Sequence, residues 1–378
     1  MNSEIGNALL IAGIDAVGIT RLPQLFARAG YRVGLLSSGH LAAAKSRFVT
    51  DWIPSGRGPQ ATAQAAREHL AKHAGRYTSV ILADEPTLWA ALDTPDNDWL
   101  KEWFPVPLEA GAVGRLTSKV DFLLDSAAAG IATPRFQICN SEQELWAAAQ
   151  ALGYPLFVKP TRGFAGSGLI FAKSKAALDA QLPKVSFDGP VLTQEEIDGS
   201  VGSISVLYDR GRPVCWFSYL MRQTWPNRFS SACTIRMYWH PDAESLVHSV
   251  GKLTGFHGLA GIDWILEPAS NRLLLLEFNP RPTPVYHLGP YAGVDFARAL
   301  ADSAAGSFAP QHPNQSARIV DMFPQSLYYS MEHRNPRRFA EALKDAPWND
   351  PRVVMAHFRR FMTHYFPSRF REYLGRWR

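Results

Sequence analysis

The sequence predicts an α/β protein of two or three domains that opens with a small doubly wound domain. The chain has 378 residues, more than one ordinary domain needs and enough to bury several apolar cores. Over roughly the first hundred residues, apolar runs of strand length alternate with helical segments, the order that gives a parallel sheet covered by helices. From Leu156 onward the pattern changes to a succession of strands, which indicates a second domain.

The predicted N-terminal domain consists of a βαβ unit followed by another helix and strand. In chain order the segments read "ALLIAGI" (strand), "TRLPQLFARAGY" (helix ending near Gly30), "RVGLLSS" (strand), "TAQAAREHLAKHAG" (helix) and "SVILAD" (strand). Gly13 and Gly18 only loosely resemble a dinucleotide-binding fingerprint, so we interpret them as turn glycines between a strand and a helix.

A turn-rich stretch, "FPVPLEAGAVG", separates this domain from the helix predicted within "TSKVDFLLDSAAAGIATP". Thr117 or Ser118 is the expected N-cap, the helix should end near Gly130, and Pro134 bars its continuation. A further helix is predicted in "AESLVHSVGKLTGFHG". The strands predicted after residue 155 read "LFVKP", "SGLIFAKS", "PVLTQEEI", "SISVLYDRGRPVCWFSYL" with a turn at Asp209–Pro213, and "GIDWILEPASNRLLLLEFN".

Charge and cysteine content narrow the class of protein. The formal net charge is +5, but the segment from His333 to Arg378 holds eleven Lys and Arg against four Asp and Glu, so the rest of the chain is slightly acidic. The three cysteines lack the spacing of a zinc site or a disulfide framework, which favours a reducing, cytoplasmic setting. Because Glu4 precedes the first apolar stretch and no run is long enough to span a bilayer, we expect neither a signal peptide nor a transmembrane segment.

The segment "LFVKPTRGFAGSGLIFAKS" combines positive charge with a glycine-rich loop. Glycines let backbone N–H groups approach an anion, and Lys159 and Arg162 supply positive charge, so the loop is suited to phosphate. The lysine precedes the glycines, whereas a Walker A loop places it after them. The alternative for Lys159 is a solvated lysine at the end of a strand.

Carboxylates at the end of "RLLLLEFNPRP" mark a second site. Side chains two residues apart on a strand share a face, so Glu277 and Asn279 point the same way. If the hairpin loop within "EPASNR" has three or five residues, Asp263 of the partner strand joins them. Two acids and an amide suit Mg²⁺ and the phosphates that it binds. The alternative is a solvated strand, or acids neutralised by Arg272 or Arg281.

Together these segments resemble the ATP-grasp superfamily, the carboxylate–amine and carboxylate–thiol ligases and their carboxylase relatives. The resemblance covers roughly Ala8 to Ala309. It is carried by "SKVDFLLDSAAAGIATP", "YPLFVKPTRGFAGSGL", "VLTQEEIDG" and "GIDWILEPASNRLLLLEFNPRP", in the family's order and at plausible spacing. It implies a Rossmann-like domain at 1–115, an ATP-grasp domain at 116–310 with a mobile lid at about 135–195, and a basic, helical C-terminal extension at 311–378.

The resemblance also implies a role for each motif residue. Lys119, whose alternative is a surface lysine in the first turn of a helix, and Lys159 would hold nucleotide phosphates under a flap that includes Gly163, Gly166, Ser167 and Gly168. Adenine and ribose would meet a hinge of Gln194, Glu195, Glu196, Ile197 and Asp198. The magnesium positions are matched by Asp263, Glu277 and Asn279, and Arg281 matches an arginine that steadies the acceptor carboxylate or its phosphate.

Two positions depart from the family's pattern. After the hinge the family commonly writes G-x-E, with the glutamate on the ribose, whereas Val201 stands there in this chain and Asp198 would have to substitute. Many relatives carry an arginine shortly before the first metal acid, where this chain has Gly261. The missing charge would then come from Arg222, Arg228, Arg236 or Arg281.

The implied activity is ATP-dependent ligation of a carboxylic acid to an amine through an acyl phosphate, with release of ADP and phosphate. The implied cofactors are ATP and Mg²⁺, with Mn²⁺ as the alternative to Mg²⁺, and Lys159 and Arg281 are the implied catalytic residues. We expect small-molecule acid and amine substrates and no nucleic acid, and leave a homo-oligomer open. A bicarbonate-phosphorylating carboxylase and a nucleotide-binding regulator without turnover are the alternatives.

The basic C-terminal segment "HFRRFMTHYFPSRFREYLGRWR" mixes arginines with aromatic residues. Two interpretations stay open: an amphipathic helix that rests on an anionic membrane or an acidic partner, and a packing helix with a solvated arginine face. We expect the second.

Overall fold

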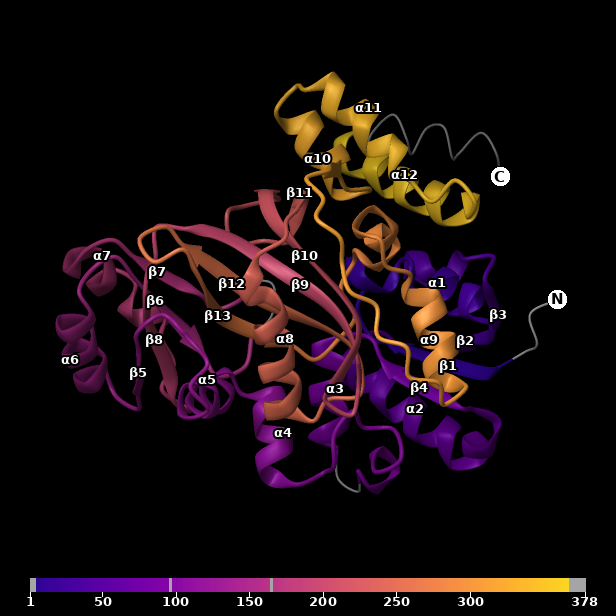
Figure 1. Ribbon diagram of the computed structural model, residues 1–378, viewed down its shortest axis with the longest axis horizontal. Coiled ribbons are helices and arrows are strands. Elements are labelled where there is room, and N and C mark those ends of the chain that lie inside the picture. Colours follow the sequence, from indigo (N-terminus) through magenta and orange to yellow (C-terminus); the bar gives the residue numbers. More distant parts are fainter. Residues whose placement is uncertain (1–4, 95–96, 164–165, 367–378) are drawn as a thin grey trace. The chain divides into compact units, whose positions relative to one another are not determined.

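The computed structural model describes residues 5–94, 97–163 and 166–366, which divide into two compact units (Figure 1). One unit comprises Met1–Thr94, Met221–Arg236 and Ala317–Arg378; the other comprises Pro95–Leu220 and Met237–Ser316. In the described part of the chain, no helix is long and apolar enough to cross a membrane. All three cysteines are free and buried.

The first unit holds a four-stranded parallel sheet with the order β3-β2-β1-β4. The predicted doubly wound N-terminal domain is therefore confirmed, and strand β3 is an element that the sequence analysis missed. Its elements are β1 (Gly6–Ala12), η1 (Val17–Ile19), α1 (Leu22–Ala29), β2 (Tyr31–Ser37), η2 (Ala42–Lys45), β3 (Val49–Pro54), α2 (Pro59–His73), η3 (Ala74–Arg76), β4 (Ser79–Leu82) and α3 (Glu85–Leu92).

Gly13 occupies a tight turn after β1. Its N–H donates to the carboxylate of Asp84, the N-cap residue of α3, at 2.9 Å. A Cβ at this position would lie 2.7 Å from Cα of Pro59, closer than real Cβ atoms approach other atoms. Gly13 is thus a packing glycine at a strand–helix turn.

Three helices at the C-terminal end pack around an aromatic core in the first unit. They are α10 (Gln325–Glu332), α11 (Pro336–Lys344) and α12 (Pro351–Tyr365), preceded by the paired strands β11 (Ala232–Met237) and β14 (Ile319–Asp321). The core contains Phe323, Leu327, Val354 and Phe361. Helix α12 packs into this core, whereas residues 367–378 of the basic C-terminal segment lie outside the described residues.

Buried polar contacts attach these helices to the N-terminal sheet domain of the same unit. Asp350, which is buried, accepts hydrogen bonds from the hydroxyl of Ser46 and, at 3.1 Å, from the N–H of Arg47. Arg360 of α12 forms an ion pair with Asp15 and donates to the carbonyl of His40. These contacts fix which face of α12 turns toward the sheet domain.

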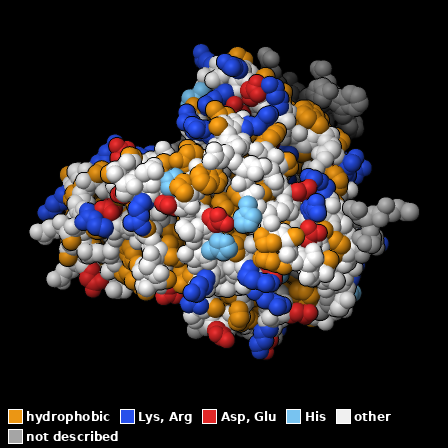
Figure 2. All heavy atoms as spheres, in the orientation of Figure 1, with side chains coloured by type: hydrophobic (Ala, Val, Ile, Leu, Met, Phe, Trp, Pro, Cys, Tyr) orange, Lys and Arg blue, Asp and Glu red, His pale blue; other side chains and the backbone are white. Residues whose placement is uncertain are grey.

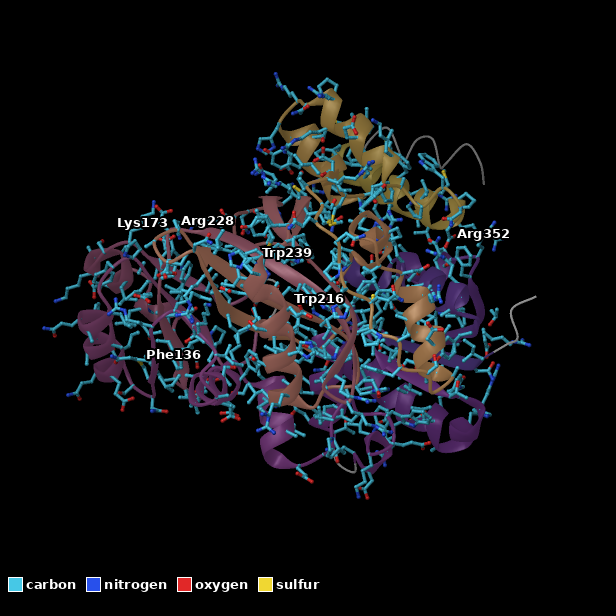
Figure 3. The ribbon with its side chains drawn as sticks, viewed as in Figure 1. Phe136, Lys173, Trp216, Arg228, Trp239 and Arg352 are labelled. Carbon is cyan, nitrogen blue, oxygen red and sulfur yellow. The ribbon has the colours of Figure 1, made fainter. Side chains whose placement is uncertain are left out.

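The second unit contains two antiparallel sheets. The smaller one, with the order β5-β8-β6-β7, packs against α6 over an apolar core. Figure 3 labels Phe136, the first residue of edge strand β5, and Lys173, which directly follows edge strand β7. In the larger one, β13, β12, β9 and β10 are neighbours in that order.

The elements of the second unit begin with η4 (Asp98–Leu100), α4 (Ala110–Thr117), α5 (Lys119–Ala128), β5 (Phe136–Cys139), α6 (Glu142–Leu152), β6 (Leu156–Pro160), β7 (Ile170–Ala172), α7 (Lys175–Asp179), η5 (Leu182–Lys184) and β8 (Val191–Glu195). They continue with β9 (Ser200–Asp209), β10 (Arg212–Thr224), α8 (Pro241–Thr254), β12 (Gly258–Glu267), β13 (Arg272–Asn279), η6 (Tyr286–Ala292) and α9 (Phe296–Ala304). The predicted helices and strands are present.

Candidate active site

A row of polar residues crosses the larger sheet. Asp263 of β12 lies directly opposite Glu277 of β13 on one side and Ser203 of β9 on the other. Ser203 in turn lies opposite Tyr219 of β10. Because directly opposed residues in an antiparallel sheet point to the same face, all four side chains share one face.

The pairing of Asp263 with Glu277 does not result from the hairpin loop of three or five residues on which the sequence analysis made it depend. Glu267 pairs with Arg272, so the loop between them has four residues, and an even number alone would place Asp263 opposite Leu276. A β-bulge between Asp263 and Trp264 leaves Leu276 out of the ladder and restores the pairing. The assumption of an odd loop was wrong, and the bulge produces the acid face instead.

Hydrogen bonds order the acids and the amide. Asn279 donates through Nδ2 to Oδ2 of Asp263 at 3.0 Å, and Arg281 donates through Nη2 to Oδ1 of Asn279 at 3.1 Å. Burial raises the pKa of Asp263, while hydrogen bonds from Ser203 and Asn279 and the charges of Arg281 and Lys119 act against that rise. Arg272 lies at the far end of the hairpin and is exposed.

Lys119 comes to the acids from a different element. It is the first residue of α5, whose N-cap is Ser118, so the structure decides between the two expected caps. The N–H of Lys119 donates to the carbonyl of Thr161 at 3.0 Å, which fixes the helix start beside the glycine loop. Its ammonium group forms an ion pair with Oε1 of Glu277. The predicted phosphate-binding lysine and the predicted metal ligand are therefore in contact.

Lys159 lies on β6 of the small sheet, in an environment that disfavours its charge. Its Nζ donates to Oε1 of Gln194 at 2.7 Å, across the pairing of β6 with β8. Burial, reinforced by the charge of Lys119 and opposed by that of Asp263, lowers the pKa of Lys159 to about 7. Lys119, whose N–H bonds to Thr161 just after β6 and whose ammonium group pairs with Glu277 of β13, brings the two sheets of the second unit together at one site.

The glycine-rich loop adopts a backbone that other residues rarely take. Gly166 and Gly168 have φ angles of 78° and 72°, in the left-handed region, and residues 166–168 are exposed. A Cβ on Gly163 would lie 2.9 Å from the carbonyl oxygen of Ser167, so the loop folds back on itself. Residues 164 and 165 of the predicted flap lie outside the described residues.

The predicted hinge contains a buried polar group that has no hydrogen-bond partner among the described residues. Gln194 is 1% exposed, and its Nε2 has no hydrogen-bond partner in the described part of the chain. The N–H of Glu195 donates to the carbonyl of Arg135, whose guanidinium also pairs with the Glu195 carboxylate at 2.7 Å. The N–H of Glu196 donates to the carbonyl of Pro155 at 3.0 Å. The buried amide of Gln194 is therefore a hinge group that is left to bind a ligand.

Both departures from the family's pattern can be located. Val201 pairs with Ile265 on β12, and the nearby acid Asp198 is exposed. A Cβ on Gly261 would lie 2.7 Å from Cγ2 of Thr283, so this position has no room for a side chain. Among the arginines expected to compensate, Arg281 is the one in the same unit as the acids, whereas Arg222, Arg228 and Arg236 belong to the other.

Sequence reasoning missed Ser203 and Tyr219. Ser203 hydrogen-bonds to the carboxylate of Asp263, and burial raises the pKa of Tyr219 to about 12, against hydrogen bonds with Ser203 and Ser205. The available signal was the alternation of β9, because the odd-numbered serines of "VGSISV" continue the face that carries Asp263.

The donor set fits a hard divalent cation bound together with phosphate. In the described segments, no three His, Cys, Asp or Glu side chains are grouped so that they could hold a metal. Two carboxylates and an amide oxygen are the partial oxygen set with which Mg²⁺ is commonly bound, the remaining ligands being water and phosphate. Asp263, Glu277 and Asn279 would hold the ion, and Lys119 and Lys159 would meet the phosphates.

Sequence comparisons agree with this geometry. The profile of the ATP-grasp domain matches residues 118–285. Curated relatives include D-alanine--D-alanine ligases of Dechloromonas aromatica (24% identical; 42% of this chain and 56% of that protein) and Ectopseudomonas mendocina (28%; 46% and 61%). The chain thus matches about three-fifths of the length of these relatives.

Solved structures of similar fold cover more of the chain. N5-carboxyaminoimidazole synthetase from Staphylococcus aureus, complexed with ADP, matches 88% of this chain and 87% of that one, with a TM-score of 0.67 and 14% identity. An L-amino acid ligase from Bacillus licheniformis matches 81% and 77%, with a TM-score of 0.57 and 17% identity. The converging lysines, the acid hairpin and the profile match together show that residues 118–285 are a domain of the ATP-grasp family.

Proposed function

We propose that this protein is an ATP-dependent ligase that joins a carboxylic acid to an amine. The observation that carries the proposal is the meeting of Lys119 from α5 with Glu277 from the hairpin, at a site whose electrostatics also involve Lys159 and Asp263. A site that gathers lysines around two carboxylates can bind a triphosphate with its divalent ion. The D-alanine--D-alanine ligases among the relatives support this class of reaction.

In the proposed reaction, an oxygen of the acid substrate attacks the γ-phosphorus of ATP. The new bond gives an acyl phosphate, and the bond from the γ-phosphorus to the bridging oxygen breaks, so that ADP leaves. The amine nitrogen then attacks the acyl carbon, the bond from that carbon to the phosphate oxygen breaks, and inorganic phosphate leaves while the nitrogen gives up a proton to solvent. Attack of one anion on another needs positive charge, which Lys119, Lys159 and Arg281 supply. Bound Mg²⁺ would neutralise the phosphate oxygens further.

The chain's own groups also position the reactants. Asp263, Glu277 and Asn279 are held by the bulged hairpin, and Arg281 is fixed through its bond to Asn279. The flap glycines Gly163, Gly166 and Gly168 would let the flap fold over the phosphates and keep water from the acyl phosphate. Holding the acyl phosphate beside the amine supplies effective molarities of about 10⁵–10⁸ M, so a covalent intermediate on the protein is not needed.

The domain limits proposed for this function are 1–115, 116–310 with a lid at about 135–195, and 311–378. The small sheet and its helices, from Phe136 to Glu195, are the part of the second unit that we assign to the lid. Lys159 and the glycine loop belong to it, so its closure would bring them to the phosphates.

The test is nucleotide-dependent turnover by the purified protein. With Mg²⁺ and pairs of amino acids or other carboxylates and amines, we expect release of ADP and phosphate together with an amide product found by mass spectrometry. ADP release that depends on bicarbonate and no amine would point to a carboxylase. Binding of ATP without turnover on any panel would point to a regulator, and absence of nucleotide binding would exclude all three.

A further inference from the structure

The outward face of α12 combines arginines with exposed apolar side chains. Arg352, Met355, Arg359 and Met362 recur at spacings of three and four residues, so they lie along one stripe of the helix. All four are exposed, and Met355 is 53% exposed. Trp348, just before the helix, is 58% exposed. We call these five residues the α12 face.

The opposite side of the same helix is occupied. Val353, Val354 and Phe361 are buried, and Arg360 is tied to Asp15 and His40. The helix therefore cannot roll to bury the α12 face without breaking its own core. A packing helix with a solvated arginine face accounts for the arginines, but it does not account for the two exposed methionines that alternate with them.

Charge on the α12 face has one sign. The helix from Pro351 to Tyr365 has no Asp or Glu, and Arg352 and Arg359 have no ion-pair partner in the described part of the chain. Figure 2 shows Lys and Arg side chains over the C-terminal helices with an acidic cluster among them, and Arg352 of α12 is labelled in Figure 3. The partner of this face should therefore be anionic.

We propose that the α12 face binds reversibly to the surface of an anionic phospholipid bilayer. Guanidinium groups pair with lipid phosphates through two parallel hydrogen bonds, and the intervening thioethers and the indole enter the boundary between headgroups and acyl chains. Nucleic acid would satisfy the arginines but leave Met355 and Met362 without a role. The short stripe suits weak, reversible binding, because stable anchoring takes a second signal.

The experiment measures co-sedimentation of the full chain with vesicles. One set is phosphatidylcholine alone, and the other contains phosphatidylglycerol as well. We expect binding to the anionic set only, weakening as salt is raised, because the attraction is screened. The double variant Arg352→Glu/Arg359→Glu should bind at least roughly 30-fold more weakly.

Two further variants isolate the cause. Met355→Gln/Met362→Gln should also lose binding, because it removes the apolar component from exposed positions without touching the core or changing the charge. Arg32→Glu/Lys72→Glu changes net charge equally at exposed sites elsewhere in the first unit and should bind like the parent. Circular dichroism checks that every variant is folded.

Several outcomes would overturn the proposal. They are absence of binding to anionic vesicles, equal loss in the control variant, and unchanged binding in the α12-face variants. Retention of RNA or an acidic protein by the α12 face, with no vesicle binding, would also overturn it.

Discussion

The lowered pKa of Lys159 predicts how many protons the protein takes up when it binds a nucleotide. With its pKa lowered to about 7, only about a tenth of the side chain is protonated at pH 8. A bound triphosphate favours the charged form and moves the pKa back toward its ordinary value of about 10.5. Close to one proton should then be taken up per nucleotide bound at pH 8.

The pH dependence of the affinity for nucleotide follows from the same coupling between binding and protonation of Lys159. Between pH 7 and the pKa of the bound state, each pH unit should weaken nucleotide binding by up to about tenfold, because Lys159 must first be protonated. Below pH 7 the lysine is already charged, and this dependence should vanish. A non-hydrolysable ATP analogue with excess Mg²⁺ keeps chemistry out of the measurement.

The assay is isothermal titration calorimetry at pH 8 in buffers of different ionisation enthalpy, which reports protons exchanged per nucleotide bound. Lys159→Arg is the matched control, since a guanidinium is charged throughout and should take up no proton. Equal uptake by the parent and Lys159→Arg would refute the assignment of the proton to Lys159. Uptake near zero in the parent would refute the lowered pKa itself.

Four further results are expected. Because the unfolded chain binds more protons than the native state between pH 7 and 10.5, the stability of the parent relative to Lys159→Met should rise over that window by on the order of a few kcal/mol, measured by urea unfolding. Glu277→Gln should lower the apparent affinity for Mg²⁺ at least tenfold in Mg²⁺ titrations of nucleotide binding. Glu68→Gln, at an exposed site, should leave this affinity unchanged. Gly261→Ala should destabilise the protein by about 1–3 kcal/mol, because its Cβ would meet Cγ2 of Thr283, and adding Thr283→Ser should recover most of the loss. Asp350→Ala should lower the free energy of unfolding by about 2–3 kcal/mol, because it leaves Ser46 and the N–H of Arg47 without their acceptor, whereas Asp98→Ala at an exposed ion pair should change it little.

Periodicity predicted the strands that carry the site, because their side chains are sorted by burial. The run "RLLLLEFN" placed Glu277 and Asn279 on one face, and Ser118 capped its helix as expected. β3 escaped notice because its half-buried pattern includes Asp51 and Pro54, which weaken the strand signal at the edge of a sheet. Local sequence pattern therefore located the acid-bearing strand and the start of the helix that carries Lys119.

Contacts between distant segments could not be predicted in the same way. The ion pair of Lys119 with Glu277 and the bond of Lys159 to Gln194 depend on how separate elements pack. The attachment of Asp350 to Ser46 likewise joins opposite ends of the chain. No sequence period relates such partners: the family resemblance implied that Lys119 and Glu277 share a site, but the contact between them is seen only in the folded arrangement.

The bulge at Leu276 has a consequence for engineering the hairpin. The bulge places Asp263 and Glu277 on the same face of the sheet by a shift of register next to these residues. The shared face therefore does not depend on which amino acids form the turn at residues 268–271. An epitope or fluorophore tag with an even number of added residues should be tolerated there, because side-chain direction repeats every two positions. An insertion with an odd number of residues would move the side chains of the strand segments beside the turn to the opposite face of the sheet. Deletion of Leu276 would do the same to Glu277 and Asn279.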